Sequence, residues 1–210
     1  MLELRALGAL LSYPTAELRE ALPEIAEAIR RSPLIAPRER AGLDVLLSEL
    51  AGGELMTAEE RYVGLFDASR AASLNLFEHL HGDSRDRGTA MVDLKRIYAR
   101  AGFELATSEL PDYLPVLLEY LSCRDLPEAR AMLADCAHIL RAIATALIAR
   151  GSAYAAVLQA LIVIAGEAPV DAAAVRPVRE QPGELDRDWA EQPAFAEVPL
   201  AAIPGRPRPR

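Results

Sequence analysis

The sequence predicts an all-α protein: a single helical-bundle-like domain of about eight to ten helices, followed by an irregular Pro-rich C-terminal tail. Hydrophobic residues make up 51% of the 210 positions but aromatic residues only 5%, so the apolar content is Leu, Ala, Ile and Val, a mixture that favours helices. Eight of the fifteen prolines lie between Pro169 and Pro209, where the helical period is lost. We therefore expect an all-helical domain at residues 1–166 and a Pro-rich mobile tail at residues 167–210.

The first quarter of the chain predicts four helices. Pro14 ends the first of them, because proline disfavours helical geometry in the residue before it. Thr15 can cap a short second helix, and Pro23 lies where the first turn of a third would begin. Pro37 opens a fourth helix, which ends at Gly52–Gly53. The core-facing residues of these helices are Leu4, Leu7, Leu10, Leu11, Ile25, Ile29, Leu43, Leu46, Leu47 and Leu50.

The longest regular pattern begins at Thr57 and Glu60, which stand in capping-box positions. It predicts a central helix that keeps one face for about five turns, as far as Leu80. Its inner positions are Tyr62, Leu65, Phe66, Ser69, Ser73, Leu76, Phe77 and Leu80. Gly82 is expected to end this helix, and Asp83 to cap the next, whose apolar side is Met91, Leu94, Ile97, Tyr98 and Ala101.

Three further helices are predicted before the tail. Pro115 is tolerable in the first only if Asp112 lies near the N-cap, since the missing N–H then costs nothing. The inward positions of this helix are Leu117, Leu118 and Leu121. Pro127 opens a long helix that Gly151 ends, and Ser152 caps a last one that runs to Gly166.

Charge and composition limit the partners. A formal charge of −8 and a pI near 5.0 argue against nucleic acid, which needs a basic surface, and suit a cationic partner. Cys123 and Cys136 show no paired spacing, so we expect reduced thiols. The N-terminus does not read as a signal peptide, and the longest apolar stretch, Gly151–Gly166, is too short to span a bilayer. We therefore expect a cytoplasmic protein without stable membrane insertion.

The stretch EHLHGDSRDRG, from Glu78 to Gly88, holds two of the three histidines. His79 and His81 point about 200° apart while the helix continues, so they cannot close on one metal ion. Ser84 has no base in a fixed relation to it, and no phosphate-binding loop occurs, so we expect neither enzymatic activity nor a bound cofactor. A corner held by caps and ion pairs is the structural alternative. A small metal-dependent hydrolase using the corner from His79 to Asp86 is the enzymatic alternative.

Residues 61–121 resemble the NarJ-type assembly chaperones, the delta subunits of respiratory nitrate reductase, within the TorD/DmsD family. The combination of FEHLHGDSRDRG, MVDL and ELPDYLP carries the resemblance, and LLSYPTAEL at residues 10–18 extends it to residues 4–164. It implies an all-helical cytoplasmic chaperone without catalytic activity. Such a protein binds the catalytic alpha subunit of nitrate reductase, including its N-terminal twin-arginine-like segment. It keeps that subunit competent for insertion of the molybdenum cofactor and for assembly of the membrane complex.

The resemblance also suggests residues for binding the client peptide. These candidates are Glu78, His79, His81, Asp83, Arg85, Asp86, Arg87, Glu109, Asp112, Tyr113 and Glu119. This chain departs from the family at Asn75 and Tyr113, where the family usually or often has histidine. We expect four carboxylates to line an acidic groove beside exposed Leu and Tyr side chains, where an amphipathic cationic peptide would bind. They are those of Glu78, Asp83, Asp112 and Glu119, and helix capping or surface solvation is the alternative for each.

Other assignments remain open at this point. The client could be another molybdoenzyme of the same class, and molybdenum cofactor delivery proteins are further candidate partners. A permanent helical subunit of a larger complex would show the same composition. Trp189, the only tryptophan, could dock on the domain or on a partner, or lie exposed in the tail.

Overall fold

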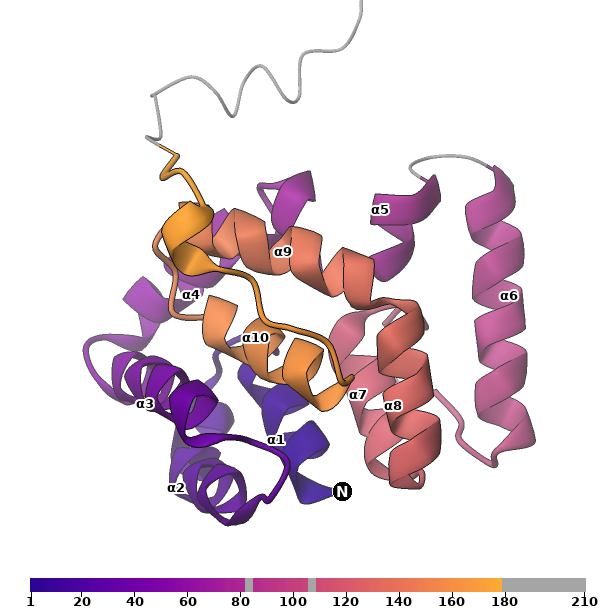
Figure 1. The fold of residues 1–210 in the computed structure, drawn as a ribbon, viewed down its shortest axis with the longest axis horizontal. Coiled ribbons are helices and arrows are strands. Elements are labelled where there is room, and N and C mark those ends of the chain that lie inside the picture. Colours follow the sequence, from indigo (N-terminus) through magenta and orange to yellow (C-terminus); the bar gives the residue numbers. More distant parts are fainter. Residues whose placement is uncertain (82–84, 106–108, 179–210) are drawn as a thin grey trace, which may run out of the picture. The chain divides into compact units, whose positions relative to one another are not determined.

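In the computed structural model the described residues are 1–81, 85–105 and 109–178. They form ten α-helices, two 3-10 helices and no β-strand, which confirms the all-α prediction (Figure 1). The elements are α1 (Leu2–Leu10), α2 (Ala16–Arg31), α3 (Pro37–Ala51), α4 (Leu55–Phe66), η1 (Arg70–Ala72), α5 (Leu76–His81), α6 (Arg85–Arg100), α7 (Leu114–Ser122), α8 (Leu126–Asp135), α9 (Ala137–Ala149), α10 (Ala155–Ile164) and η2 (Ala172–Ala174). The chain divides into two units, Met1–Arg179 and Glu180–Arg210, and all of these elements belong to the first.

Helix α7 forms the core together with α1, which packs along it. Gly8 permits the close approach, because a Cβ at this position would lie 3.2 Å from the Cβ of Leu118 on α7. Every residue of α7 from Leu114 to Leu121 except Glu119 is buried, and the predicted inward positions of this helix are confirmed. Because α7 is buried on nearly all sides, the residues immediately before it, 109–113, are held against the core at their C-terminal end.

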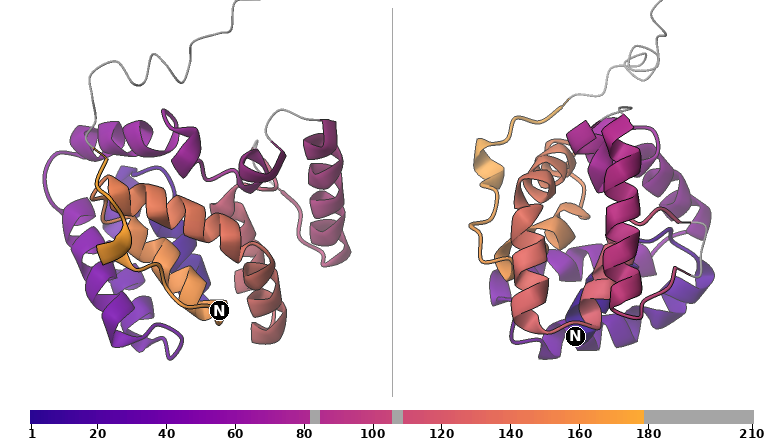
Figure 2. Two further views of the ribbon diagram at one scale, coloured as in Figure 1. Left: turned by 45° about the horizontal axis from the view of Figure 1, so that its top comes forward. Right: turned by 90° about the vertical axis from the view of Figure 1, so that its right-hand side faces the viewer.

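Helices α9 and α10 pack against each other, and α10 also contacts α3 and α8. Helix α10 returns alongside α9 in Figures 1 and 2. The turn between them contains Gly151, whose φ is +64°. Seven of the ten residues of α10 are buried, which explains why its sequence is apolar almost throughout.

Helix α6 lies at the edge of the helical unit (Figures 1 and 2). Leu94 and Tyr98 are its buried side chains among the described residues, whereas Ile97 is 40% exposed. The predicted apolar side of α6 is therefore only partly covered. The Tyr98 hydroxyl donates to the carbonyl of Pro111 at 2.8 Å, which ties α6 to the segment before α7.

One helix replaces the two that the sequence predicted between Thr15 and Arg31. Thr15 does cap it, accepting a hydrogen bond from Leu18 N–H at 3.2 Å, but Pro23 lies inside α2. The separate start predicted at Pro23 is therefore wrong. Leu22, Ile25 and Ile29 keep one buried face on both sides of the proline, so packing compensates for the missing N–H donor.

The long helix predicted from Thr57 to Leu80 is also wrong, because it is divided into α4, η1 and α5. Helix α4 starts at Leu55, before the predicted capping box. After Phe66 the two serines of the predicted inner face are buried outside any α-helix. Ser69 Oγ accepts from the Arg150 guanidinium at 2.7 Å, and Ser73 Oγ accepts from Asn75 N–H at 3.2 Å. Serine favours such local and tertiary hydrogen bonds over the helix interior.

The long helix predicted to start at Pro127 is divided as well, into α8 and α9, which meet at Cys136 with an angle of 67°. The Cys136 thiol donates to carbonyls of the last turn of α8, and burial raises its pKa to about 11. Among the described residues, no single helix has both the length and the apolar composition to cross a membrane. Helices α8 and α9 meet those two criteria only when taken together.

The chain continues along the domain after α10. Residues 167–178, here called the strap, run alongside α9 and α10 and include η2 (Figure 1). Hydrogen bonds to the domain thus extend beyond Gly166, where the sequence placed the domain boundary. The predicted mobile tail from residue 179 onward, with Trp189, lies outside the described residues.

Candidate functional site

Two segments 35 residues apart meet where the sequence placed its candidates. The backbone carbonyl of Asp112 accepts from Leu76 N–H at 3.0 Å, and its carboxylate Oδ2 accepts from Phe77 N–H at 3.0 Å. Leu114 N–H donates to the backbone carbonyl of Leu74 at 2.8 Å, and Asn75 and Tyr113 form an isolated antiparallel β-bridge. Leu76 and Phe77 are the first residues of α5, so Asp112 caps a helix from another part of the chain. We call this contact between residues 74–78 and 109–114 the junction.

Asp112 is fully buried, with 0% of its surface exposed. The expectation that its carboxylate lines an exposed groove is therefore wrong, and helix capping describes its position. Burial raises the pKa of the Asp112 carboxyl, while the Phe77 N–H and the Arg87 guanidinium lower it and Glu78 raises it. Oδ1 has no hydrogen-bond partner among the described residues. A buried oxygen without a partner explains why desolvation is the largest of these effects.

Glu78, the last residue of the first junction segment, and His79, which follows it, both have hydrogen-bond partners within the protein. Arg87 of α6 donates to Glu78 Oε1 at 3.1 Å, and both side chains are partly buried. His79 Nε2 lies 2.9 Å from the carbonyl of Ser73, which can only accept, so Nε2 carries the proton. The Glu78–Arg87 pair thus joins α5 to α6, and His79 joins α5 to the segment that precedes it.

The remaining candidates divide between the surface and the undescribed part of the chain. Asp86 is exposed on the first turn of α6, and Glu119 is exposed on α7 without an ion pair among the described residues. Asp83 lies outside the described residues, as do the side chains of His81 and Arg85. In the described ranges, no three His, Cys, Asp or Glu side chains gather as metal ligands would. Of the four carboxylates predicted to line an acidic groove, Asp112 is buried and Asp83 lies outside the described residues.

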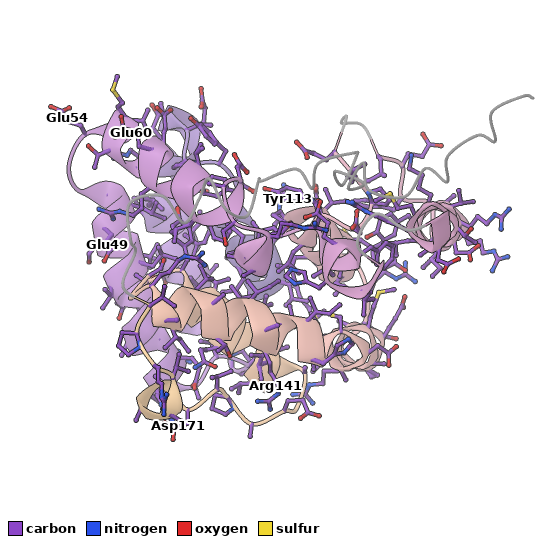
Figure 3. All side chains as sticks on the ribbon, turned by 90° about the horizontal axis from the view of Figure 1, so that it is seen from above. Glu49, Glu54, Glu60, Tyr113, Arg141 and Asp171 are labelled. Atoms are coloured by element: carbon purple, nitrogen blue, oxygen red, sulfur yellow. The ribbon has the colours of Figure 1, made fainter. Side chains whose placement is uncertain are left out.

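A row of tyrosines leads from the junction through the buried Tyr62 of α4 to Tyr13, just after α1. The Tyr62 hydroxyl donates to the carbonyl of Leu11 at 2.8 Å, so the Tyr113 hydroxyl, 2.9 Å away, donates to Tyr62. The rings of Tyr62 and Tyr13 meet edge to face, with centroids 5.6 Å apart. Tyr113 lies between α4 and α5 (Figure 3). This row connects the junction to the C-terminal end of α1.

Exposed apolar side chains occur at or close to these tyrosines along the chain. Tyr13 is 43% exposed, Val63 on α4 is 41% exposed, and Leu110 in the turn before Tyr113 is 40% exposed. We call these residues, together with Tyr62 and Tyr113, the aromatic strip. Exposed apolar side chains such as Tyr13, Val63 and Leu110 are typical of a surface that binds another chain.

Three carboxylates border the aromatic strip. Burial raises the pKa of both Tyr13 and Tyr113, and nearby negative charge raises each further: Glu59 and Asp67 for Tyr13, and Glu109 and Asp67 for Tyr113. Asp67 follows α4 directly, and Glu59 lies on the same flank of that helix as Val63. We call Glu59, Asp67 and Glu109 the acidic rim. The aromatic strip and the acidic rim together are complementary to an amphipathic segment with positive charges.

The candidates taken from the sequence thus cover only part of this surface. Glu109 and Tyr113 belong to it, whereas Tyr13, Glu59, Val63, Asp67 and Leu110 were missed. Tyr62 was expected to be an ordinary core residue, and its hydroxyl contacts depend on residues about 50 positions away on either side. The available signal was Tyr13, an aromatic residue in the proline-containing turn that ends the first helix.

Replacing Tyr113 by phenylalanine tests the row of hydroxyls. The variant loses one donor to Tyr62 but leaves the bond from Tyr62 to Leu11 intact, so we expect the free energy of unfolding to fall by about 0.5–1.5 kcal/mol. Urea denaturation followed by circular dichroism would measure this. A loss above about 3 kcal/mol would mean that Tyr113 is held by more than this bond.

Comparison with known proteins places the chain among characterised sequences. The family model described as nitrate reductase delta subunit matches residues 13–160. The nitrate reductase molybdenum cofactor assembly chaperone NarJ of Escherichia coli (strain K12) is 38% identical over 199 residues, covering 91% of this chain and 84% of that protein. The probable nitrate reductase molybdenum cofactor assembly chaperone NarW of the same organism is 34% identical over 194 residues, which cover 90% and 81%. The probable NarJ of Bacillus subtilis (strain 168) is 31% identical over 157 residues, which cover 75% and 84%.

Proposed function

The chain belongs to the nitrate reductase delta subunit family, and from this premise we propose that it is an assembly chaperone of nitrate reductase without catalytic activity of its own. Its client is the catalytic alpha subunit, which it binds in part through the N-terminal twin-arginine-like segment. Binding keeps the alpha subunit competent for insertion of the molybdenum cofactor and for assembly of the membrane complex. The observation that supports client binding most directly is the aromatic strip with its acidic rim.

The strip and the rim match the chemistry of such a segment. A twin-arginine-like segment carries cations next to apolar residues, and an amphipathic helix would place the apolar residues against Tyr13, Val63 and Leu110. Its arginines would then lie near Glu59, Asp67 and Glu109. Apolar anchors carry most of the affinity in such complexes, while charges at the border steer and select.

The junction positions the residues of this surface. Asp112 caps the N-terminus of α5, and the next residue, Tyr113, forms a hydrogen bond with the hydroxyl of Tyr62 on α4. Residues 109–114 therefore join the start of α5 to Tyr62 on α4. In this proposal Asp112, Glu78 and Arg87 are positioning residues that do not contact the client.

The chaperone function is tested by deleting the gene in the native organism. We expect the nitrate reductase polypeptides to remain present but to lack molybdenum cofactor, as measured by cofactor content of the purified enzyme. Normal cofactor loading in the deletion strain would refute the proposal. Co-purification of the protein with mature, cofactor-loaded enzyme would indicate a permanent subunit instead.

A further inference from the structure

The strap is held to the domain by contacts that involve its backbone. The side-chain amide of Gln159 on α10 pairs with both backbone groups of one strap residue: Nε2 donates to Val170 C=O at 2.8 Å, and Val170 N–H donates to Oε1 at 2.8 Å. This is the pairing that a neighbouring strand would offer an extended chain. Gln159 thus contacts only backbone atoms of Val170, so these two hydrogen bonds do not depend on which side chain stands at position 170.

Helix α9 supplies contacts on either side of this pair. The Arg141 guanidinium donates to the carbonyl of Ala168, and the carbonyl of Ala149 accepts from Val178 N–H at 2.8 Å. Figure 3 labels Arg141, the residue of α9 that contacts the beginning of the strap, and Asp171 within the strap. The strap therefore runs in the same direction as α9, from the level of Arg141 to the end of that helix.

The strap's own side chains contribute little to this attachment. Residues 171–174 are exposed, and Asp171 accepts from Ala173 N–H within the strap itself. Glu167 adds an ion pair with Arg141 at 3.7 Å on a solvent-exposed surface, where such pairs add little. Val170 packs against the hydrophobic core as a partly buried side chain. One apolar residue and a series of backbone contacts are a loose requirement that many sequences meet.

We propose that the strap-facing surface of α9 and α10, carried by Arg141, Ala149 and Gln159, is a binding site for an extended peptide, which the chain's own strap occupies. Its ligand class is an extended segment with one aliphatic residue at the place of Val170. This site goes beyond the proposed function, because its contacts involve neither the aromatic strip nor the junction.

The tether explains why the site is closed to other peptides. The strap begins three residues after the end of α10, so its local concentration at Gln159 is on the order of millimolar or more. A free peptide at micromolar concentration cannot compete with that. The site opens only when the strap is released.

A proline substitution in the full-length chain releases the strap selectively. Val170→Pro removes the N–H that donates to Gln159 Oε1, whereas Ala172→Pro is the matched control, because residue 172 is the first of η2 and proline is tolerated there. Amide hydrogen exchange of residues 167–178 should increase in V170P and stay unchanged in A172P. If exchange in V170P also stays unchanged, the backbone pair does not hold the strap and the proposal fails.

The released site is then titrated with a labelled synthetic peptide of residues 166–174. We expect V170P to bind it at least about tenfold more tightly than the wild type, and the added Gln159→Leu change to abolish binding. The same peptide N-methylated at the Val170 position should lose at least about tenfold in affinity. A peptide with altered sequence but the same valine should bind within about threefold. No binding to released V170P, or binding that ignores Gln159→Leu, would overturn the proposal.

Discussion

Replacing Asp112 by alanine is expected to lower the free energy of unfolding by about 1–3 kcal/mol, because the N–H of Phe77 loses its acceptor inside the protein. Asp112 is fully buried, so water cannot replace the carboxylate oxygen without entering the core. The loss should exceed that of Glu119→Ala on the exposed side of α7, which we expect to stay within about 0.5 kcal/mol. Urea denaturation of the two variants gives the comparison. Equal effects of the two substitutions would show that Asp112 does not cap α5.

The charge of Asp112 should be separable from its role as an acceptor. Asparagine keeps an oxygen for the Phe77 N–H but cannot ionise. Burial raises the pKa of the Asp112 carboxyl above its ordinary value of 3.8, so the folded protein holds the proton more tightly than the unfolded chain. Its stabilising contribution is therefore fully present below that ordinary value and is lost as pH rises through the raised pKa.

The free energy of unfolding of the wild type minus that of Asp112→Asn should consequently decrease as pH rises through this window, and then become constant. The charged groups facing Asp112 are Arg87 from α6 and Glu78 from α5, and they act in opposite directions. A difference that increases with pH would mean that Arg87 outweighs burial and that the carboxyl pKa is lowered.

Local patterns predicted the helices whose ends depend on their own residues. The apolar spacing of α1, α3 and α7 is a property of short segments, and so are the Thr15 cap and the glycine turns. The division between α4 and α5 depends instead on Asp112, 35 residues further along the chain. The apolar periodicity alone assigns Ser69 and Ser73 to a helix. It carries no information about Arg150, which donates to Ser69, or about the junction residue Asn75, which donates to Ser73.

The same limit applies to the candidate site. The resemblance placed Asp112 and Tyr113 in one functional group, but it could not tell a capping carboxylate from an exposed one. That distinction requires the burial of Asp112 and the direction of its carboxylate toward α5. The aromatic strip combines the end of α1, the flank of α4 and the turn before α7. No local pattern brings these three segments together.

Tyr13→Ala is expected to weaken binding of the alpha-subunit N-terminal peptide by about 2 kcal/mol, roughly thirtyfold. Tyr13 is a large side chain of the strip that is 43% exposed and packs edge to face against the buried ring of Tyr62, so it is an anchor that is already ordered. Calorimetric titration of the full-length protein at two salt concentrations measures the effect. The loss should be similar at both, because an apolar contact is not screened.

The acidic rim should respond differently to salt. The double variant Glu59→Gln, Asp67→Asn is expected to lose about three- to tenfold in affinity at low salt and almost nothing at high salt, because charges at an exposed border act through screened attraction. The matched control is Glu24→Gln, Asp135→Asn, which changes the net charge equally at exposed positions on α2 and α8. If the control lowers affinity as much as the rim variant, the attraction comes from net charge and the rim does not select the client. If Tyr13→Ala and the rim variant both bind normally, the client segment binds elsewhere on the domain.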